Sequence, residues 1–151
     1  MVFSAKFWGV RGSIACPSPR HVGFGGNTSC LEIRAGDQRL IFDAGTGIRS
    51  LGRDIVDHDV RFAHLLLTHT HWDHINGLPF FAPLYAPGNV IGIYGPQQPG
   101  LAIEAAVRQQ MQAEYSPLYG TTLGANVRFH DLHEESLEFG PVKVVFHVCK
   151  I

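Results

Sequence analysis

The apolar positions of the chain form short runs that are typical of strands, separated by turn-rich segments. Seven segments are predicted to be strands: Phe3–Val10, Cys30–Ile33, Arg39–Asp43, Phe62–Leu67, Val90–Tyr94, and two final strands near Val127–His130 and Pro141–Val148. Gly36 and Asp37 predict a hairpin turn between the second and the third of these. The run 62–67 is apolar almost throughout, which is typical of a strand covered on both faces.

Two helices are expected between the strands. Ile48, Leu51 and Ile55 recur at the spacing of one helical face. Pro99 is expected to open a longer helix that reaches Met111, because proline is favoured in the first turn of a helix. Strands that alternate with helices predict one α/β layered domain over residues 1–151.

Composition and charge exclude some classes of partner. Hydrophobic residues make up 45% of the chain and charged residues 17%, which is an ordinary globular balance. The formal net charge is −1 and Lys and Arg are scattered, so no basic stripe is available for a nucleic acid. A few local cations would still suffice for a small phosphorylated substrate. No apolar run approaches the roughly 20 residues that a membrane helix needs.

The cysteines indicate the redox environment. Cys16, Cys30 and Cys149 lie far apart, and their odd number does not suggest a disulfide framework. We expect free thiols in a reducing cytoplasm. The first six residues lack the basic start of a signal peptide, so the sequence predicts a soluble, cytoplasmic protein.

Histidine is the anomalous residue, with nine copies in the chain and several around one strand. The strand 62–67 delivers His69 to its carboxyl end, where α/β sheets usually place ligand sites. His69 and His71 are two apart in extended chain, so their side chains point the same way and can converge on one cation. Asp73 and His74 follow on the next turn and can reach a second cation nearby.

A single such residue would more simply be a surface histidine or, for Asp73, a helix cap. Here four potential ligands lie within six positions, directly after an apolar strand. This pattern predicts a metal site instead. Imidazole and carboxylate together suit Zn²⁺, as one or two ions, and Mn²⁺ or Fe²⁺ less selectively. No organic cofactor is expected, because Ser50 stands where a dinucleotide-binding motif that begins at Gly45 and Gly47 needs its third glycine.

The pattern His69-x-His71-x-Asp73-His74 resembles the metal-binding motif of the metallo-β-lactamase superfamily. Four segments are similar to the bacterial branch of metal-dependent phosphodiesterases that also includes the tRNA 3′-processing endonucleases: Phe7–Ser13, Gly25–Cys30, Asp43–Gly47 and Leu66–His74. The resemblance runs from about Phe3 to about Val144. It implies an αββα fold in which two similar halves pack sheet against sheet.

The resemblance also implies a role for each residue of the motif. His69 and His71 would bind a first metal, and Asp73 and His74 a second. A hydroxide held between the metals would attack the substrate, while Asp73, as the catalytic residue, would orient or deprotonate the attacking water. Asp43 would hold a ligand imidazole or the backbone of the motif, and it could equally cap the turn that follows it.

In the resembled family, later segments supply a His that completes the first site, an Asp that bridges the metals and a final His. The chain stops at Ile151, about where the first of these is expected. It therefore resembles the N-terminal half of the fold with the opening strands of the second half. His147 lies near the expected place, but the residues after it do not match, and we interpret it as an ordinary strand histidine.

Three hypotheses for function follow. The first is a metal-dependent hydrolase of phosphodiesters that acts on a small phosphorylated substrate through a metal-bound hydroxide. The second is hydrolysis of another ester, a thioester or a lactone, on the same scaffold. The third is a catalytically inactive partial domain with residual metal binding.

An oligomer is also expected. The strands around 39–43, 62–67 and 90–94 are apolar on both sides, although the sheet that would cover one of these sides belongs to the missing half. An apolar sheet face that is left open to water usually marks an interface. A homodimer or larger homo-oligomer could cover the open face about a two-fold axis.

Overall fold

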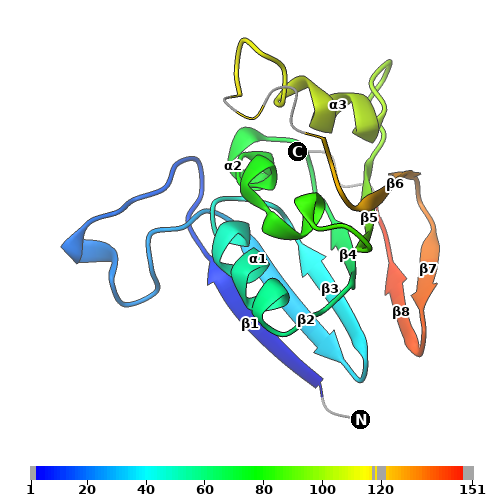
Figure 1. Ribbon diagram of the computed structural model, residues 1–151, viewed down its shortest axis with the longest axis horizontal. Helices are drawn as coiled ribbons and strands as arrows, with labels where there is room; N and C mark the ends of the chain where they lie inside the picture. The colour runs from blue at the N-terminus through cyan, green and yellow to red at the C-terminus, as the bar shows by residue number, and fades with distance from the viewer. Residues whose placement is uncertain (1–2, 117, 119–121, 148–151) are drawn as a thin grey trace.

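The computed structural model describes residues 3–116, 118 and 122–147. Six strands form one mixed sheet in the order β1-β2-β3-β4-β5-β6, and two more form a separate hairpin (Figure 1). The strands are β1 Phe3–Gly9, β2 Cys30–Ala35, β3 Gln38–Phe42, β4 Phe62–Leu66, β5 Val90–Pro96, β6 Asn126–Leu132, β7 Ser136–Phe139 and β8 Val142–Val145. The described helices are α1 Ile48–Asp57, α2 Trp72–Ile75 and α3 Ile103–Gln109, with short 3-10 turns η1 Pro19–His21, η2 Leu78–Phe80 and η3 Ala82–Tyr85.

The sheet changes direction once. Strands β1, β2 and β3 are antiparallel, and the predicted hairpin between β2 and β3 is confirmed, with Ala35 opposite Gln38. Strands β3, β4, β5 and β6 are parallel. Because four neighbouring strands run the same way, their carboxyl ends meet at one edge of the sheet.

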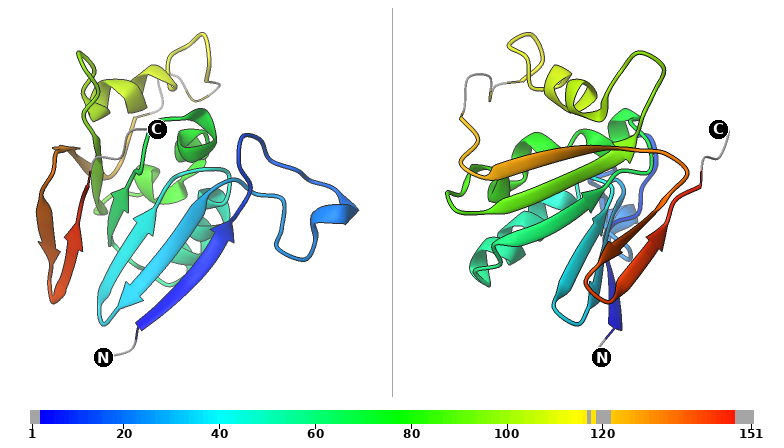
Figure 2. Two further views of the ribbon diagram at one scale, coloured as in Figure 1. Left: turned by 180° about the vertical axis from the view of Figure 1, so that it is seen from behind. Right: turned by 90° about the vertical axis from the view of Figure 1, so that its right-hand side faces the viewer.

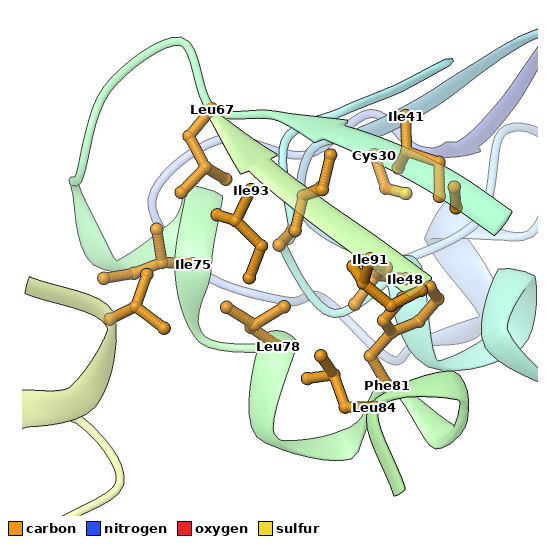
Figure 3. Close-up of a cluster of buried hydrophobic side chains, with 14 of the residues drawn as sticks. Cys30, Ile41, Ile48, Leu67, Ile75, Leu78, Phe81, Leu84, Ile91 and Ile93 are labelled. Atoms are coloured by element: carbon orange, nitrogen blue, oxygen red, sulfur yellow. The ribbon is translucent and has the colours of Figure 1, made fainter. Parts of the chain in front are cut away.

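The helices cover one face of the sheet and enclose the main core (Figure 3). Helix α1 buries Ile48, Leu51 and Ile55 completely or almost so, as its 3.6-residue spacing predicts. Ile41 of β3 and Phe81, just after η2, are fully buried in the same cluster. Each such side chain contributes about 1.5–3 kcal/mol when it leaves water.

The β7–β8 hairpin lies on the opposite face of the sheet (Figure 2). A smaller apolar cluster lies beneath this hairpin. Leu40 and Leu66 of the sheet pack there against Phe139 of the hairpin. Alternation along β3 explains the division, because successive side chains of a strand point to opposite faces. The final strands therefore fold back over part of the face that we expected to be open.

The remaining part of that face lies over β1. Phe7 pairs with Leu31, which pairs with Phe42 at the edge of the hairpin cluster, so Phe7 shares this face. Phe3 and Phe7 are both 68% exposed. The homo-oligomer stays a prediction.

Two expectations for the last third of the chain were wrong. Helix α3 begins at Ile103 and not at Pro99, because the Asp131 carboxylate accepts the Ile103 N–H at 2.7 Å and fixes the helix start there. The expected two final strands are three. The first joins the large sheet as β6, and the region predicted as one strand from Pro141 contains only β8, which follows a turn at Gly140 with φ 57°.

Two further findings bear on the expected environment. Cys16 and Cys30 form no disulfide within the described residues, and Cys149 lies outside them. No helix in the described part of the chain is both long and apolar enough to cross a membrane.

A histidine outside the predicted metal motif is buried under the hairpin. His64 of β4 is 7% exposed, and its ring centroid lies 4.2 Å from that of Phe139. Its Nδ1 lies 3.1 Å from the Tyr94 hydroxyl. Burial lowers the pKa of His64 from 6.5 to about 4, because the charged imidazolium loses hydration there.

Acid should therefore destabilise the hairpin side of the sheet. Between pH 6.5 and about pH 4 the unfolded chain binds a proton at His64 that the folded chain does not, so stability falls as the pH drops through this window. His64→Phe removes this titration. When the pH drops from 7 to 4.5, the free energy of unfolding of the variant should therefore fall by on the order of 2 kcal/mol less than that of the parent. Urea unfolding at both pH values measures the difference.

The matched control is His58→Phe, because the side chain of His58 is 67% exposed. Its free energy of unfolding should change between the two pH values as much as that of the parent. Equal acid sensitivity of the parent and His64→Phe would contradict the prediction.

Candidate metal centre

The carboxyl ends of β3 and β4 bring Asp43 and the predicted metal motif together. Asp43 directly follows β3, and His69 follows the neighbouring parallel strand β4 after two connecting residues. His71 stands in extended conformation before α2, whose first residues include Asp73 and His74. Loops at the carboxyl ends of parallel strands are the usual place for a ligand site.

The four side chains of the motif are neighbours in space. The ring centroids of His69 and His71 are 4.5 Å apart, and those of His69 and His74 are 4.0 Å apart. The Oδ2 atom of Asp73 lies 3.4 Å from His74 Nε2. Burial, followed by repulsion from His74 and His71, lowers the pKa of His69, so its ring is neutral at pH 7.

The Asp43 carboxylate connects the two ends of the motif. Its Oδ1 accepts hydrogen bonds from the Thr68 N–H at 2.9 Å and from the Thr68 hydroxyl at 2.8 Å. Its Oδ2 lies 2.8 Å from His74 Nδ1 and accepts a hydrogen bond from the Ser29 hydroxyl at 3.1 Å. Asp43 is 5% exposed, and these four contacts satisfy the buried charge.

The same contacts determine which nitrogen of each imidazole carries the proton. A carboxylate can only accept, so His74 Nδ1 donates to Asp43, and in the neutral ring the electron pair is therefore on Nε2. The Thr68 hydroxyl gives its hydrogen to Asp43, so His69 Nδ1, 3.0 Å away, donates to the Thr68 oxygen. His69 and His74 therefore both present Nε2 as a free donor, the form in which histidine binds a metal.

Two strained residues border this network. Ser13 and Asp43 have left-handed backbones, with φ values of 64° and 63°. Such conformations cost about 1–3 kcal/mol and cluster at functional sites. The Ser13 N–H donates to Asp73 Oδ2 at 2.7 Å. Burial alone would raise the pKa of Asp73, but this hydrogen bond is the largest of the contacts that lower it, and the pKa lies below its ordinary value.

Backbone contacts fix the motif to the turn after β3. The Ala44 N–H donates to the His74 carbonyl at 2.7 Å, and the Gly77 N–H donates to the Ala44 carbonyl at 2.8 Å. Gly45 lies so close to this segment that a methyl group there would overlap the Asp73 carbonyl oxygen. Glycine is required at position 45 by this close approach of two chain segments.

The structure brings two more histidines near the motif. His69, His133 and His147 line one cavity of about 430 Å³. His147 lies two residues beyond the end of β8, so its interpretation as a strand histidine was wrong. Within residues 3–116, 118 and 122–147, however, no three His, Cys, Asp or Glu side chains are arranged to hold a metal ion together. The motif side chains are adjacent but not aimed at one point.

The chemistry of the donors nevertheless fits a divalent ion such as Zn²⁺. Neutral imidazole and carboxylate are its usual ligands, and a ligand imidazole whose second nitrogen donates to a carboxylate is the common arrangement around zinc. His74 has this arrangement directly with Asp43, whereas His69 is linked to the same carboxylate through the Thr68 hydroxyl. Rotation of side chains would be needed to bring these donors onto one ion.

Sequence reasoning missed two contributors to the site. Ser13 lies in the segment 7–13 that carries part of the family resemblance, but nothing in the sequence indicates that its N–H reaches Asp73. Thr68 directly precedes the motif, and a hydroxyl beside His69 was a signal that could have been used. Asp43, by contrast, was assigned the task of holding an imidazole, and its carboxylate contacts His74.

Comparison with known proteins gives relatives for both sequence and fold. An atrochrysone carboxyl ACP thioesterase of Cryptosporiopsis sp. is 37% identical over 71 residues, which cover 44% of this chain and 22% of that protein. A diphosphatase from the PhnP family superposes with a TM-score of 0.66 at 15% identity, over 95% of this chain and 56% of that one. The short form of human tRNase Z gives a TM-score of 0.53 at 22% identity, over 86% of this chain and 45% of that one.

This chain thus corresponds to about half of the two solved structures and to a smaller share of the curated thioesterase. The two solved structures share the fold of this chain. A family model described as the metallo-β-lactamase superfamily matches residues 23–145, a range that contains Asp43 and the whole motif. The chain belongs to the metallo-β-lactamase superfamily.

Proposed function

We propose that this chain carries the metal-binding part of a hydrolase that acts on phosphodiesters. The observation that carries the proposal is the Asp43 carboxylate, which contacts both ends of the motif and leaves His69 and His74 with free Nε2 atoms. Two proteins of the same fold are named as a diphosphatase and a tRNase, which supports chemistry at phosphorus. The substrate, a small phosphorylated molecule, is part of the proposal.

In this proposal His69 and His71 hold one divalent ion, and Asp73 and His74 hold a second. When bound, the ions would activate water and neutralise charge on the phosphate oxygens. Asp73, fixed by the Ser13 N–H, orients the attacking water and accepts its proton. Asp43 keeps the imidazoles in the tautomer that can bind.

Further ligands would complete the site. His133 and His147 line the same cavity as His69, so both are candidates within the described residues. Strand register constrains neither of them, because His133 follows the end of β6 and His147 follows the end of β8.

Thioester hydrolysis is the second candidate, and a specific observation favours it. The curated relative described above is named as a thioesterase, at a higher identity than either solved structure. The same metal motif could polarise a thioester carbonyl, since fold does not decide the substrate. A non-catalytic domain that binds metal is the third candidate, because the chain covers only part of its relatives.

Metal content tests the ligand set. Protein loaded with Zn²⁺ and then dialysed should retain metal, whereas a His69→Ala/His71→Ala variant should lose most of it, because two of the proposed donors are gone. Atomic emission spectroscopy gives metal per chain. A His21→Ala/His58→Ala variant removes two histidines outside the motif and should match the parent. Equal metal content in the motif variant and the parent would overturn the site.

The role of Asp43 can be tested by removing its charge alone. Asp43→Asn should weaken Zn²⁺ affinity by about 10–100-fold, because the imidazoles lose the acceptor that sets their tautomer. Asparagine tolerates the left-handed backbone at this position, and thermal unfolding verifies that the variant is folded. Competition with a chromogenic chelator measures the affinity.

Asp59→Asn is the matched control, since Asp59 also has a left-handed backbone, with φ 50°, and its side chain is 79% exposed. It should bind Zn²⁺ as the parent does. An unchanged affinity in Asp43→Asn would show that the carboxylate does not orient the ligands.

Activity tests the reaction. Zn²⁺-loaded protein should hydrolyse bis(p-nitrophenyl) phosphate, and Asp73→Ala should lose about 10²–10⁴-fold in turnover because the residue that steers the water is gone. A chelator should abolish the reaction, and Asp57→Ala, which changes an exposed carboxylate at the end of α1, should leave it unchanged. Chelator-resistant turnover, or full activity in Asp73→Ala, would contradict the mechanism. Faster turnover of the thioester S-acetyl-N-acetylcysteamine would favour the second candidate.

A further inference from the structure

A second cavity borders the metal motif and takes no part in the proposed metal binding. It measures about 410 Å³ and lies among residues of α2, η2, α3 and the segment that follows α3. This volume is within the range of about 300–1,000 Å³ that small-molecule sites occupy. It is separate from the cavity of His69 and His147.

The motif itself forms the wall between the two cavities. The backbone at His71 is extended, and successive side chains of an extended chain point to opposite sides. His69 lines the cavity on the histidine side, whereas Thr70 and Trp72 line the second one. A molecule in the second cavity would therefore lie next to the proposed metal ligands without displacing them.

Three aromatic side chains contribute to the lining of this second cavity. Trp72 and Tyr115 are both 73% exposed, and Phe80 is 48% exposed, although all three border the cavity. Exposed aromatic rings gathered at one concave surface mark a binding site, because each gains free energy when a ligand covers it. Rings also favour other rings as partners, in offset or edge-to-face contact.

The polar part of the lining is neutral and incompletely paired. The described residues that line the cavity include no Asp, Glu, Lys, Arg or His. Asn76 Oδ1 and Gln110 Nε2, from two of these residues, are buried and have no hydrogen-bond partner within the described chain. An acceptor and a donor left without partners are costly, and a ligand that offers the complementary pair would satisfy both once the amides turn towards it.

Helix α3, which forms one wall of the cavity, is held firmly in place. Ile103 and Val107 of α3 are buried against the sheet, and the Asp131 carboxylate holds the first turn of the helix. Ala106 lies on the cavity side of the same helix. A larger side chain at Ala106 would therefore fill the cavity without disturbing the buried side of α3.

We propose that this cavity binds an uncharged planar ring whose edge carries a hydrogen-bond donor and acceptor, and that the ring is part of the substrate hydrolysed at the metal motif. The lining offers no cation to a phosphate, which favours the histidine side for the phosphate. The link to the substrate rests on the proposed function, whereas binding of the ring requires no metal.

Three uncharged probes separate the features of the ligand. Benzamide has a planar ring with an amide edge, cyclohexanecarboxamide has the same edge on a puckered ring, and toluene has the planar ring alone. In metal-free protein, ligand-observed NMR should show benzamide binding about two- to tenfold more tightly than cyclohexanecarboxamide, because ring stacking is lost in the latter. Toluene should also bind more weakly, because it leaves the amides unsatisfied.

Two variants locate the binding. Ala106→Phe should abolish benzamide binding by filling the cavity, and Tyr115→Ala should weaken it by removing an exposed ring. Phe3→Ala removes an equally exposed aromatic side chain from β1 and should leave binding unchanged. Thermal unfolding verifies that each variant is folded. Equal affinity for benzamide and cyclohexanecarboxamide, or undiminished benzamide binding in both cavity variants, would overturn the proposal.

The link to the substrate has its own measurement. Bis(p-nitrophenyl) phosphate and methyl p-nitrophenyl phosphate release the same product, but only the first has a second ring for the cavity. Its advantage in kcat/KM should shrink in Ala106→Phe, and an unchanged advantage would exclude the cavity from substrate binding. If neither compound is hydrolysed, the proposed function fails, while the metal-free binding data still decide whether the cavity takes a ring.

Discussion

The buried carboxylate of Asp43 is the constraint on which the candidate site depends. It lies where β3 ends, and its two oxygens collect donors from the end of β4, from α2 and from the segment before β2. A charge this deeply buried is tolerated only while its partners stay in place, since removal of one leaves the others and the charge unsatisfied. The left-handed backbone at Asp43, the close approach at Gly45 and the tautomers of two imidazoles all follow from this single position.

The motif and the strands that deliver it could be predicted because their signals are local. The apolar run of β4, the alternate histidines and the spacing of α1 each depend on neighbours in sequence. The contact of Ser13 with Asp73 could not be predicted, because it joins residues sixty positions apart. The start of α3 was misplaced for the same reason, since Asp131, 28 residues further on, outweighs the local preference of Pro99.

The β7–β8 hairpin connects stability with the site. It covers His64 and Leu66 on one face of the sheet, and the chain that leaves it brings His147 to the cavity of His69. Loss of packing beneath the hairpin would therefore also move a candidate ligand. We expected this face to be open. The apolar pattern of a strand indicates that both of its sides are covered, but it does not indicate which later segment covers them.

The hydrogen bond from Ser13 to Asp73 also has a consequence for the order of folding. Its sixty-residue span closes a long loop, and the entropy of closing such a loop must be offset by contacts made elsewhere. The β2–β3 hairpin and α1 involve only near neighbours in sequence, so little loop-closure entropy is lost when they form. The Ser13–Asp73 bond needs the segment after β1 and helix α2 in place together, so contacts between near neighbours cannot form it. The Asp73 carboxylate in the histidine-rich turn is thus held by a part of the chain that the turn itself cannot supply.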